Sequence, residues 1–147
     1  MQTKYDLSRF HAAQARDYAD ALAEIRAGRK RSHWIWYVFP QLRGLGRSPY
    51  AVRFGLDGAG EARAYYDDPV LGARLREITA ALGDLPDGDI GRIMGSDIDA
   101  LKLRSCMTLF ARVAPECGLF ARALERFYGG RADDMTLRLI EGADEQT

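Results

Sequence analysis

The longest helical pattern in the sequence covers residues 97–114 and constrains the fold more than any other segment. Apolar residues recur in it at spacings of three and four, which is the repeat of one face of an α-helix. One stripe consists of Leu103, Met107, Phe110 and Ala114, and Leu101, Leu109 and Val113 widen it. Because a helix that is apolar around most of its circumference has to be covered by other elements, we expect this segment to be the central helix.

Glycine and proline residues divide the rest of the chain into segments of helical length. The spacing of apolar residues predicts helices over residues 17–27, 70–82, 90–94, 119–127 and 134–140, with a further helical turn or two at 61–66. Asp134 is a candidate cap for the last of them, and Gly95, Ser96 and Asp97 mark a stop followed by a new N-cap. Five glycines and Pro49 make residues 44–60 an irregular connection or a pair of short elements. Since no pair of strands stands out, the sequence predicts an all-α fold, a compact single-domain orthogonal helical assembly.

The composition favours one globular domain without a nucleic-acid or membrane partner. Hydrophobic residues make up 47% of the 147 residues and charged residues 29%, a profile unlike that of disordered chains. Lys plus Arg and Asp plus Glu each total 21, so no global field attracts nucleic acid or an anionic membrane. No segment reaches the roughly eighteen uninterrupted apolar residues of a membrane span. Cys106 and Cys117 form no CxxC pair and no secretory signal is visible, so we expect a cytoplasmic domain over residues 1–147 with a frayed tail from about 141.

Residues 33–48 read HWIWYVFPQLRGLGRS and contain one half of a candidate site. The apolar run 34–39 fits a buried strand as well as a buried helix, and packing in the core accounts for most of its side chains. Trp34 or Trp36 could still stack on a planar ligand. The loop that follows offers groups that bind phosphate or carboxylate, although an ordinary turn explains its glycines equally well. These groups are Gln41, Arg43, Arg47 and Ser48.

The other half of the candidate site lies on the expected central helix. Asp99, Lys102 and Ser105 are spaced by three residues, so they share one face of that helix. Lys102 stands between apolar neighbours, where it extends to solvent, pairs with Asp99 or binds a ligand. Asp97 and Asp99 also suit the positive end of the helix, and capping explains at least one of them.

These observations give a set of candidate residues for an acid/base reaction on a small anionic compound. An imidazole titrates near neutrality, which makes His33 a candidate proton donor or acceptor, although a histidine hydrogen-bonded at a helix end is the commoner case. The candidate catalytic residues are His33, Asp99 and Lys102, and the candidate ligand-binding residues are Trp34, Trp36, Gln41, Arg43, Arg47, Ser48 and Ser105. No HExxH, GxSxG or CxxC motif occurs and the two histidines are isolated, so we expect no metal and no cofactor. Cys106 is expected to be an inert buried thiol.

Five phrases along the chain resemble a bacterial family of unknown function, number 1810 in the series of domains of unknown function. They are LSRFHAAQ, GRKRSHWIWYVFPQLRGLGRS, EARAYYDDPVLGARL, DALKLRSCMTLF and FYGG. The resemblance covers nearly the whole chain and implies a compact, mostly α-helical single domain, with a helix at 34–39 and no established activity. The family's shared phrases fall, without assigned roles, on His33, Trp34, Trp36, Pro40, Gln41, Gly44, Gly46, Ser48, Lys102, Ser105 and Thr108.

Members of that family often carry the label calpastatin, which the sequence does not favour. The eukaryotic inhibitor of that name is an extended, disordered chain, whereas this chain has few prolines and a dense periodic apolar pattern. The phrase EARAYYDDPVLGARL is also similar to one in the family of ADP-ribose N-glycosidases related to riboflavin-pathway enzymes.

Two functions therefore stand side by side. In the first, residues 41–48 and the face that carries Lys102 close into one pocket for a phosphorylated or nucleotide-derived, ADP-ribose-like compound, whether as an enzyme or as a binding domain. In the second, a flat apolar surface of several hundred Å² binds another protein or a second copy of the chain. A cavity shared by the two segments favours the first function, and the oligomeric state is left open.

Overall fold

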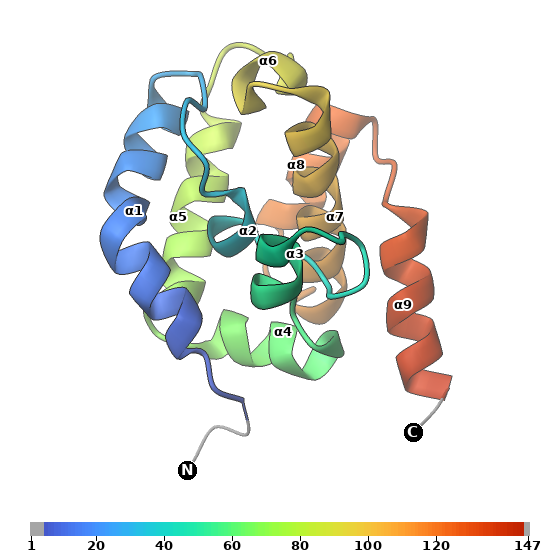
Figure 1. Cartoon of the computed structure of the whole chain (residues 1–147). Helices are drawn as coiled ribbons and strands as arrows, with labels where there is room; N and C mark the ends of the chain where they lie inside the picture. The colour runs from blue at the N-terminus through green and yellow to red at the C-terminus, as the bar shows by residue number, and fades with distance from the viewer. Residues whose placement is uncertain (1–4, 146–147) are drawn as a thin grey trace.

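The computed structural model describes residues 5–145, which form nine helices (Figure 1). They are α1 (Ser8–Arg26), α2 (Ile35–Val38), α3 (Pro49–Phe54), α4 (Gly58–Asp67), α5 (Leu71–Gly83), α6 (Ile90–Met94), α7 (Asp97–Val113), α8 (Leu119–Tyr128) and α9 (Asp134–Glu145). Among these residues the only β-type pairing is a single parallel bridge between Leu42 and Leu56. The all-α prediction is confirmed, and no helix within residues 5–145 is both long and apolar enough to cross a membrane.

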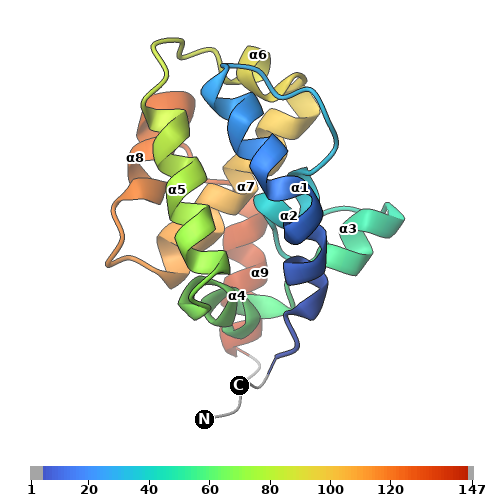
Figure 2. The same ribbon diagram turned by 90° about the vertical axis from the view of Figure 1, so that its left-hand side faces the viewer.

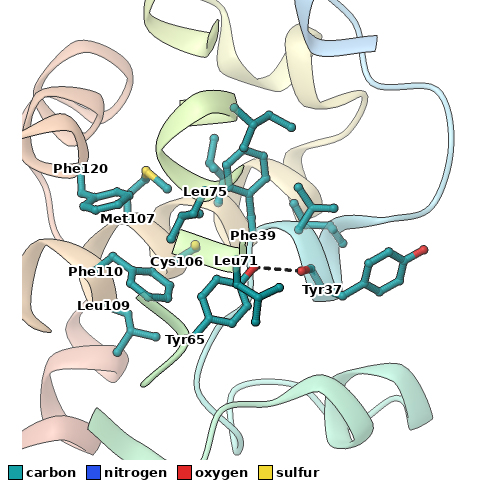
Figure 3. Close-up of a cluster of buried hydrophobic side chains, with 14 of the residues drawn as sticks. Tyr37, Phe39, Tyr65, Leu71, Leu75, Cys106, Met107, Leu109, Phe110 and Phe120 are labelled. Atoms are coloured by element: carbon teal, nitrogen blue, oxygen red, sulfur yellow. Dashed lines mark hydrogen bonds between the residues drawn. The ribbon is translucent and has the colours of Figure 1, made fainter. Parts of the chain in front are cut away.

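Helix α7 is central, as its apolar pattern predicts. It packs against α2, α4, α6, α8 and α9, while α1 and α5 lie side by side and α4 crosses the base of the molecule (Figures 1 and 2). Figure 3 shows its side chains Cys106, Met107, Leu109 and Phe110 in the core. The Phe110 ring lies 5.7 Å from the Tyr65 ring and 5.6 Å from the Phe120 ring, measured between centroids. Burial raises the pKa of the Cys106 thiol, which disfavours the reactive thiolate form.

The junction between α6 and α7 fixes where the first turn of α7 stands. Gly95 ends α6 with a φ of 83°, a left-handed conformation that glycine adopts without strain. The Ser96 hydroxyl then accepts a hydrogen bond from the Asp99 backbone N–H at 3.1 Å, which caps α7. The predicted stop and new cap are confirmed, with Ser96 as the capping residue.

The structure corrects the predicted boundaries of two helices. Helix α1 begins at Ser8 instead of residue 17, because Phe10, Ala13 and Gln14 continue its buried face. Only Ile35–Val38 is helical in the apolar run that the resemblance predicted as a helix at 34–39. Phe39 precedes a proline, which disfavours helical backbone at that residue.

The C-terminal helix also differs from its prediction. Asp133, not Asp134, caps α9, because its carboxylate accepts hydrogen bonds from the backbone N–H and the hydroxyl of Thr136. Helix α9 then continues to Glu145, beyond its predicted end at residue 140. Thr136 and Ile140 bury its inner face, and the helix packs against α4 and α7. Residues 146 and 147 of the expected tail lie outside the described residues.

Candidate functional site

Lys30 is buried at the amino end of α7, where it pairs with a carboxylate. Its Nζ atom lies 2.8 Å from Asp99 Oδ2, and its side chain is only 5% exposed. The loop that carries it is tied to α6, since the Lys30 backbone N–H donates to the Ile93 carbonyl at 2.7 Å. The ammonium group also faces the Trp34 ring at 5.1 Å. Asp99 is therefore held in an ion pair that the sequence analysis did not anticipate.

Glu24 on α1 fixes the loop that places Lys30 and Trp34. Its carboxylate accepts hydrogen bonds from the backbone N–H groups of Arg31 and Ser32, from the Ser32 hydroxyl and from the Trp34 indole N–H. Partial burial alone would raise the pKa of this carboxyl, but the four hydrogen bonds outweigh it and lower the pKa from 4.5 to about 2. Glu24 is therefore an ionised anchor for the loop at neutral pH.

We predict that Glu24 contributes stability that is lost in acid. A folded-state pKa below the unfolded one gives stability that is fully present above pH 4.5 and disappears as the pH falls through about 2. The free energy of unfolding of the parent, measured by urea denaturation, should therefore fall more steeply between these two pH values than that of Glu24→Gln. Glu24→Gln should also be the less stable of the two at pH 7. Parallel pH curves for both proteins would show that Glu24 is not this anchor.

Lys102 and Trp36 meet beside the ion pair. The Lys102 Nζ atom lies 4.9 Å from the centroid of the Trp36 ring and 3.8 Å from Asp99 Oδ1. Trp36 stacks in turn on the half-exposed Tyr50 of α3, with the ring centroids 4.8 Å apart. The Trp36 indole N–H is buried and has no hydrogen-bond partner within the described part of the chain. The two candidate segments thus touch each other at Lys102 and Trp36.

A hollow of about 360 Å³ opens where these segments meet, and we call it the Lys102 groove. Its walls are Gln41, Leu45, Gly46, Ile98, Leu101, Lys102, Arg104, Ser105, Asp133 and Met135. Two further hollows lie next to it. One of about 310 Å³ shares Ile98 with the groove, and one of about 370 Å³ shares His33 and Trp36 with that 310 Å³ hollow. We call these three hollows together the trough; their linings extend from the loop at 41–46 past Trp36 to Arg16 and Asp17 of α1.

The charges around the groove leave an excess of positive charge. Asp133 is occupied by Arg104, 3.4 Å away, and by Thr136. Asp99 is occupied by Lys30. Lys102 is more exposed than Lys30 and lies farther from Asp99. No other carboxylate among residues 5–142 pairs with Lys102, so its ammonium has N–H groups available for a ligand. A small anion is the ligand that this arrangement favours.

A family model matches almost the whole chain, which identifies the family. The model described as "Protein of unknown function (DUF1810)" matches residues 4–140. The chain belongs to the DUF1810 family. The resemblance that the five phrases indicate is therefore confirmed.

A solved structure shares both the sequence and the fold of this DUF1810 chain. It is described as the crystal structure of the conserved hypothetical protein Rv1873 from Mycobacterium tuberculosis, and it is 47% identical. The match covers 93% of this chain and 97% of that chain, with a TM-score of 0.90. A comparison with curated proteins found no match. The family model thus shows the family and the solved structure shows the fold, and the description of neither names an activity.

Several predicted site residues of the DUF1810 chain gather at the trough. Gln41, Lys102 and Ser105 line the Lys102 groove, while His33, Trp36 and Asp99 line the adjoining hollow. The position of the loop at 41–46 has two causes. The Gln41 carbonyl accepts from the Leu56 N–H at 2.9 Å, which fixes the loop. A Cβ atom on Gly46 would stand 2.8 Å from that of Ala51, so the loop lies directly on α3.

Other predicted residues lie elsewhere. Trp34 is 1% exposed and has no surface for a ligand. Arg43 and Arg47 are exposed and line none of the three hollows of the trough. The Ser48 hydroxyl caps α3 by accepting from the Ala51 N–H at 3.1 Å. The bridge to Leu56 holds Leu42 in the core, and the next residue, Arg43, is exposed.

Three residues at the trough, Lys30, Tyr50 and Arg104, are not in the predicted set of site residues. Lys30 stands in the run GRKR, which is typical of a solvated surface, so nothing in the sequence marks it as buried. Arg104 follows Lys102 by two residues, which places it off the face shared by Asp99 and Lys102, and only the packing of α9 brings it to the groove. Tyr50 comes from α3, which the sequence did not predict as a defined helix.

Proposed function

We propose that this protein binds a small phosphorylated or nucleotide-derived anion in the Lys102 groove. The observation that carries the proposal is the position of Lys102. Its ammonium lies on the Trp36 ring, in the wall of a hollow that two distant segments share, beside a carboxylate that Lys30 already neutralises. A cation placed on an aromatic ring next to a hollow suits a ligand with an anionic group and a planar part.

The apolar rim of the groove supports a ligand with an extended body. Ile98 is 67% exposed, and Leu101 and Met135 are about half exposed. Large apolar side chains at the edge of a polar hollow supply contact area, while Lys102 and Arg104 supply charge. Nucleotides, ADP-ribose and sugar phosphates combine an anionic group with such a body.

Within this proposal, His33 is the group best suited to move a proton. Asp99 is committed to Lys30 and lies near Lys102, whereas His33 is exposed and lines the hollow next to the groove. Any reaction would therefore use His33 as the acid/base, with Lys102 offsetting substrate charge and Asp99 positioning the lysines.

Thermal unfolding of the parent and of Lys102→Ala tests the proposal. A library of nucleotides, ADP-ribose and sugar phosphates is screened at fixed concentration. A ligand at about 100 times its Kd stabilises by about 2.7 kcal/mol, which raises the Tm of a domain of this size by about 5–10 °C. We expect such a shift for the parent and a much smaller one for Lys102→Ala.

Arg112→Ala is the matched control, because Arg112 is exposed on the same helix and lines none of the hollows of the trough. It removes the same charge and should keep the full ligand shift. An equal shift in Lys102→Ala and the parent, or no shift with any compound, contradicts the proposal.

A second candidate function is protein interaction, which the cluster of exposed Ile98, Leu101 and Met135 favours. Its test is the oligomeric state in sedimentation velocity. Association that is lost in Ile98→Ser, combined with no ligand shift, would favour this function over the first.

We also propose that the protein acts in a reducing bacterial cytoplasm. Cys106 and Cys117 are both free, which suits that compartment, and the similar structure comes from a bacterium.

A further inference from the structure

A larger hollow lies on another part of the surface, between α5 and α8. It has a volume of about 590 Å³, and α5 and α8 lie side by side in Figure 2. None of its lining residues lines the Lys102 groove. It exists because small side chains face each other across the helix pair, namely Ala80 and Gly83 on α5 and Ala123 on α8. We call it the α5–α8 cavity.

Thr79 gives this cavity an unused polar group. Thr79 lines the cavity and is 3% exposed, and its hydroxyl has no hydrogen-bond partner among the described residues. The helical hydroxyls of Ser105 and Thr108 donate to the carbonyl four residues earlier, at 3.2 Å and 2.8 Å. A buried hydroxyl without a partner is costly, and a ligand oxygen would remove that cost.

Two arginines stand at the mouth of the cavity and, in the described part of the chain, only one of them has hydrogen-bond partners. Arg126 donates hydrogen bonds to the carbonyls of Gly83 and Leu85, which end α5, so its guanidinium is used. Arg122 makes no ion pair or side-chain hydrogen bond within the described residues. Its Nη1 atom lies 2.9 Å from where a Cβ of Gly118 would stand, which places the guanidinium beside the first turn of α8. Arg122 and the amino end of α8 thus add their positive charge at one place.

The carboxylates at the mouth do not neutralise Arg122. Asp84 lies at the C-terminal end of α5, and the Glu125 carboxylate folds back over Gly130, since its Oε2 atom lies 2.6 Å from a Cβ built there. Neither forms an ion pair with Arg122 in the part of the chain that the structure describes. The cavity therefore has an apolar interior, a buried hydroxyl and, at its mouth, the Arg122 guanidinium, unpaired among the described residues, together with the carboxylates of Asp84 and Glu125.

From this arrangement we infer that the α5–α8 cavity binds a small amphiphilic carboxylate. The apolar body packs against Leu119, Ala123 and Phe127. The carboxylate meets Arg122. The Thr79 hydroxyl, which exposes less than 1 Å², donates to an oxygen along the body after rotation about the Cα–Cβ bond of Thr79. The volume is within the range of pockets for small organic ligands, and a single guanidinium without a hydrogen-bond or ion-pair partner among residues 5–142 suits a monoanion better than a phosphate ester.

Fluorescence of 8-anilinonaphthalene-1-sulfonate, with displacement by decanoate and by 10-hydroxydecanoate, tests the inference. The dye is an aromatic monoanion that emits in apolar sites. We expect both acids to displace it from the parent. Ala80→Leu fills the cavity from a half-buried helical position and should remove most of the dye signal. Arg122→Ala should weaken both acids by about tenfold.

Thr79→Val keeps the inference falsifiable if Ala80→Leu folds poorly. Replacing an unpaired buried hydroxyl by a methyl group of the same shape should raise the Tm without ligand by about 2–4 °C. The same variant should bind the hydroxy acid more weakly and decanoate unchanged. A purely structural role for Thr79 would raise the Tm without changing the preference between the two acids, and that result overturns its part in the site.

Lys102→Ala is the control, and it separates this inference from the proposed function. It should keep full binding of the dye and of both acids, just as Ala80→Leu should keep the shift produced by a phosphorylated anion. Dye binding that persists in Ala80→Leu, or that decanoate does not displace, would overturn the inference and leave the Lys102 groove unaffected.

Discussion

Asp99→Ala is expected to reduce the free energy of unfolding by about 3–5 kcal/mol, although Asp99 lies near a surface hollow. The reason is Lys30, whose buried ammonium loses its partner at 2.8 Å and has no other carboxylate within ion-pair distance among residues 5–142. Leaving a buried charge unpaired lowers the free energy of unfolding by far more than the intact ion pair adds to it. Urea denaturation at neutral pH measures the change.

Two controls separate the buried charge from other effects of Asp99→Ala. Lys102→Ala removes the second, more exposed partner of Asp99 and should cost less than about 1 kcal/mol. The double variant Lys30→Met and Asp99→Leu replaces the pair by apolar groups and should recover most of the lost stability. If Asp99→Ala is no less stable than Lys102→Ala, then Lys30 does not depend on Asp99. The double variant is also the proper background for testing Asp99 as a catalytic residue, since it removes the carboxylate without leaving Lys30 unpaired.

Trp34→Ala is expected to destabilise the protein by about 3–5 kcal/mol, whereas Trp36→Ala should cost far less. The Trp34 ring is fully buried, packs 6.1 Å from the Phe39 ring, and faces the Lys30 ammonium. Its removal leaves a cavity and takes one hydrogen bond from Glu24. Trp36 is only half-buried, between Lys102 and Tyr50. The same urea titration of both variants compares them.

The two tryptophans should also differ in ligand binding. Trp36→Ala should lose the thermal shift produced by an anion in the Lys102 groove, because the ring that supports Lys102 is gone. Trp34→Phe keeps most of the buried volume and should retain that shift. Equal losses of stability in Trp34→Ala and Trp36→Ala would contradict this division of roles.

Local patterns in the sequence predict the helices well, because each helix has its own apolar face and its own end signals. The face of α7 and the junction at Gly95 and Ser96 are examples, since both depend on residues close together in the chain. The one-turn helix α2 is harder, because a wholly apolar run has no period. Helix α9 extends beyond its prediction because its inner face is buried by α4 and α7, which local sequence does not contain.

The candidate site was predictable in part for the same reason. The spacing of Asp99, Lys102 and Ser105 is a local property of α7, and two of these residues, Lys102 and Ser105, line one hollow together with Gln41. The role of Lys30 was not predictable, because its burial depends on contacts with α6 and α7 across more than sixty residues of chain. The exposure of Arg43 likewise accompanies the pairing of Leu42 with Leu56.

The positions of the two tryptophans make intrinsic fluorescence a probe of ligand binding. They are the only tryptophans in the chain, they stand two positions apart, and one is sealed while the other borders the trough. Collisional quenching by iodide should therefore reach one emitter and spare the other, so the intrinsic emission has two components of different accessibility. A compound that protects the accessible component from iodide therefore binds at the trough, whereas a compound that binds between α5 and α8 should leave the quenching unchanged.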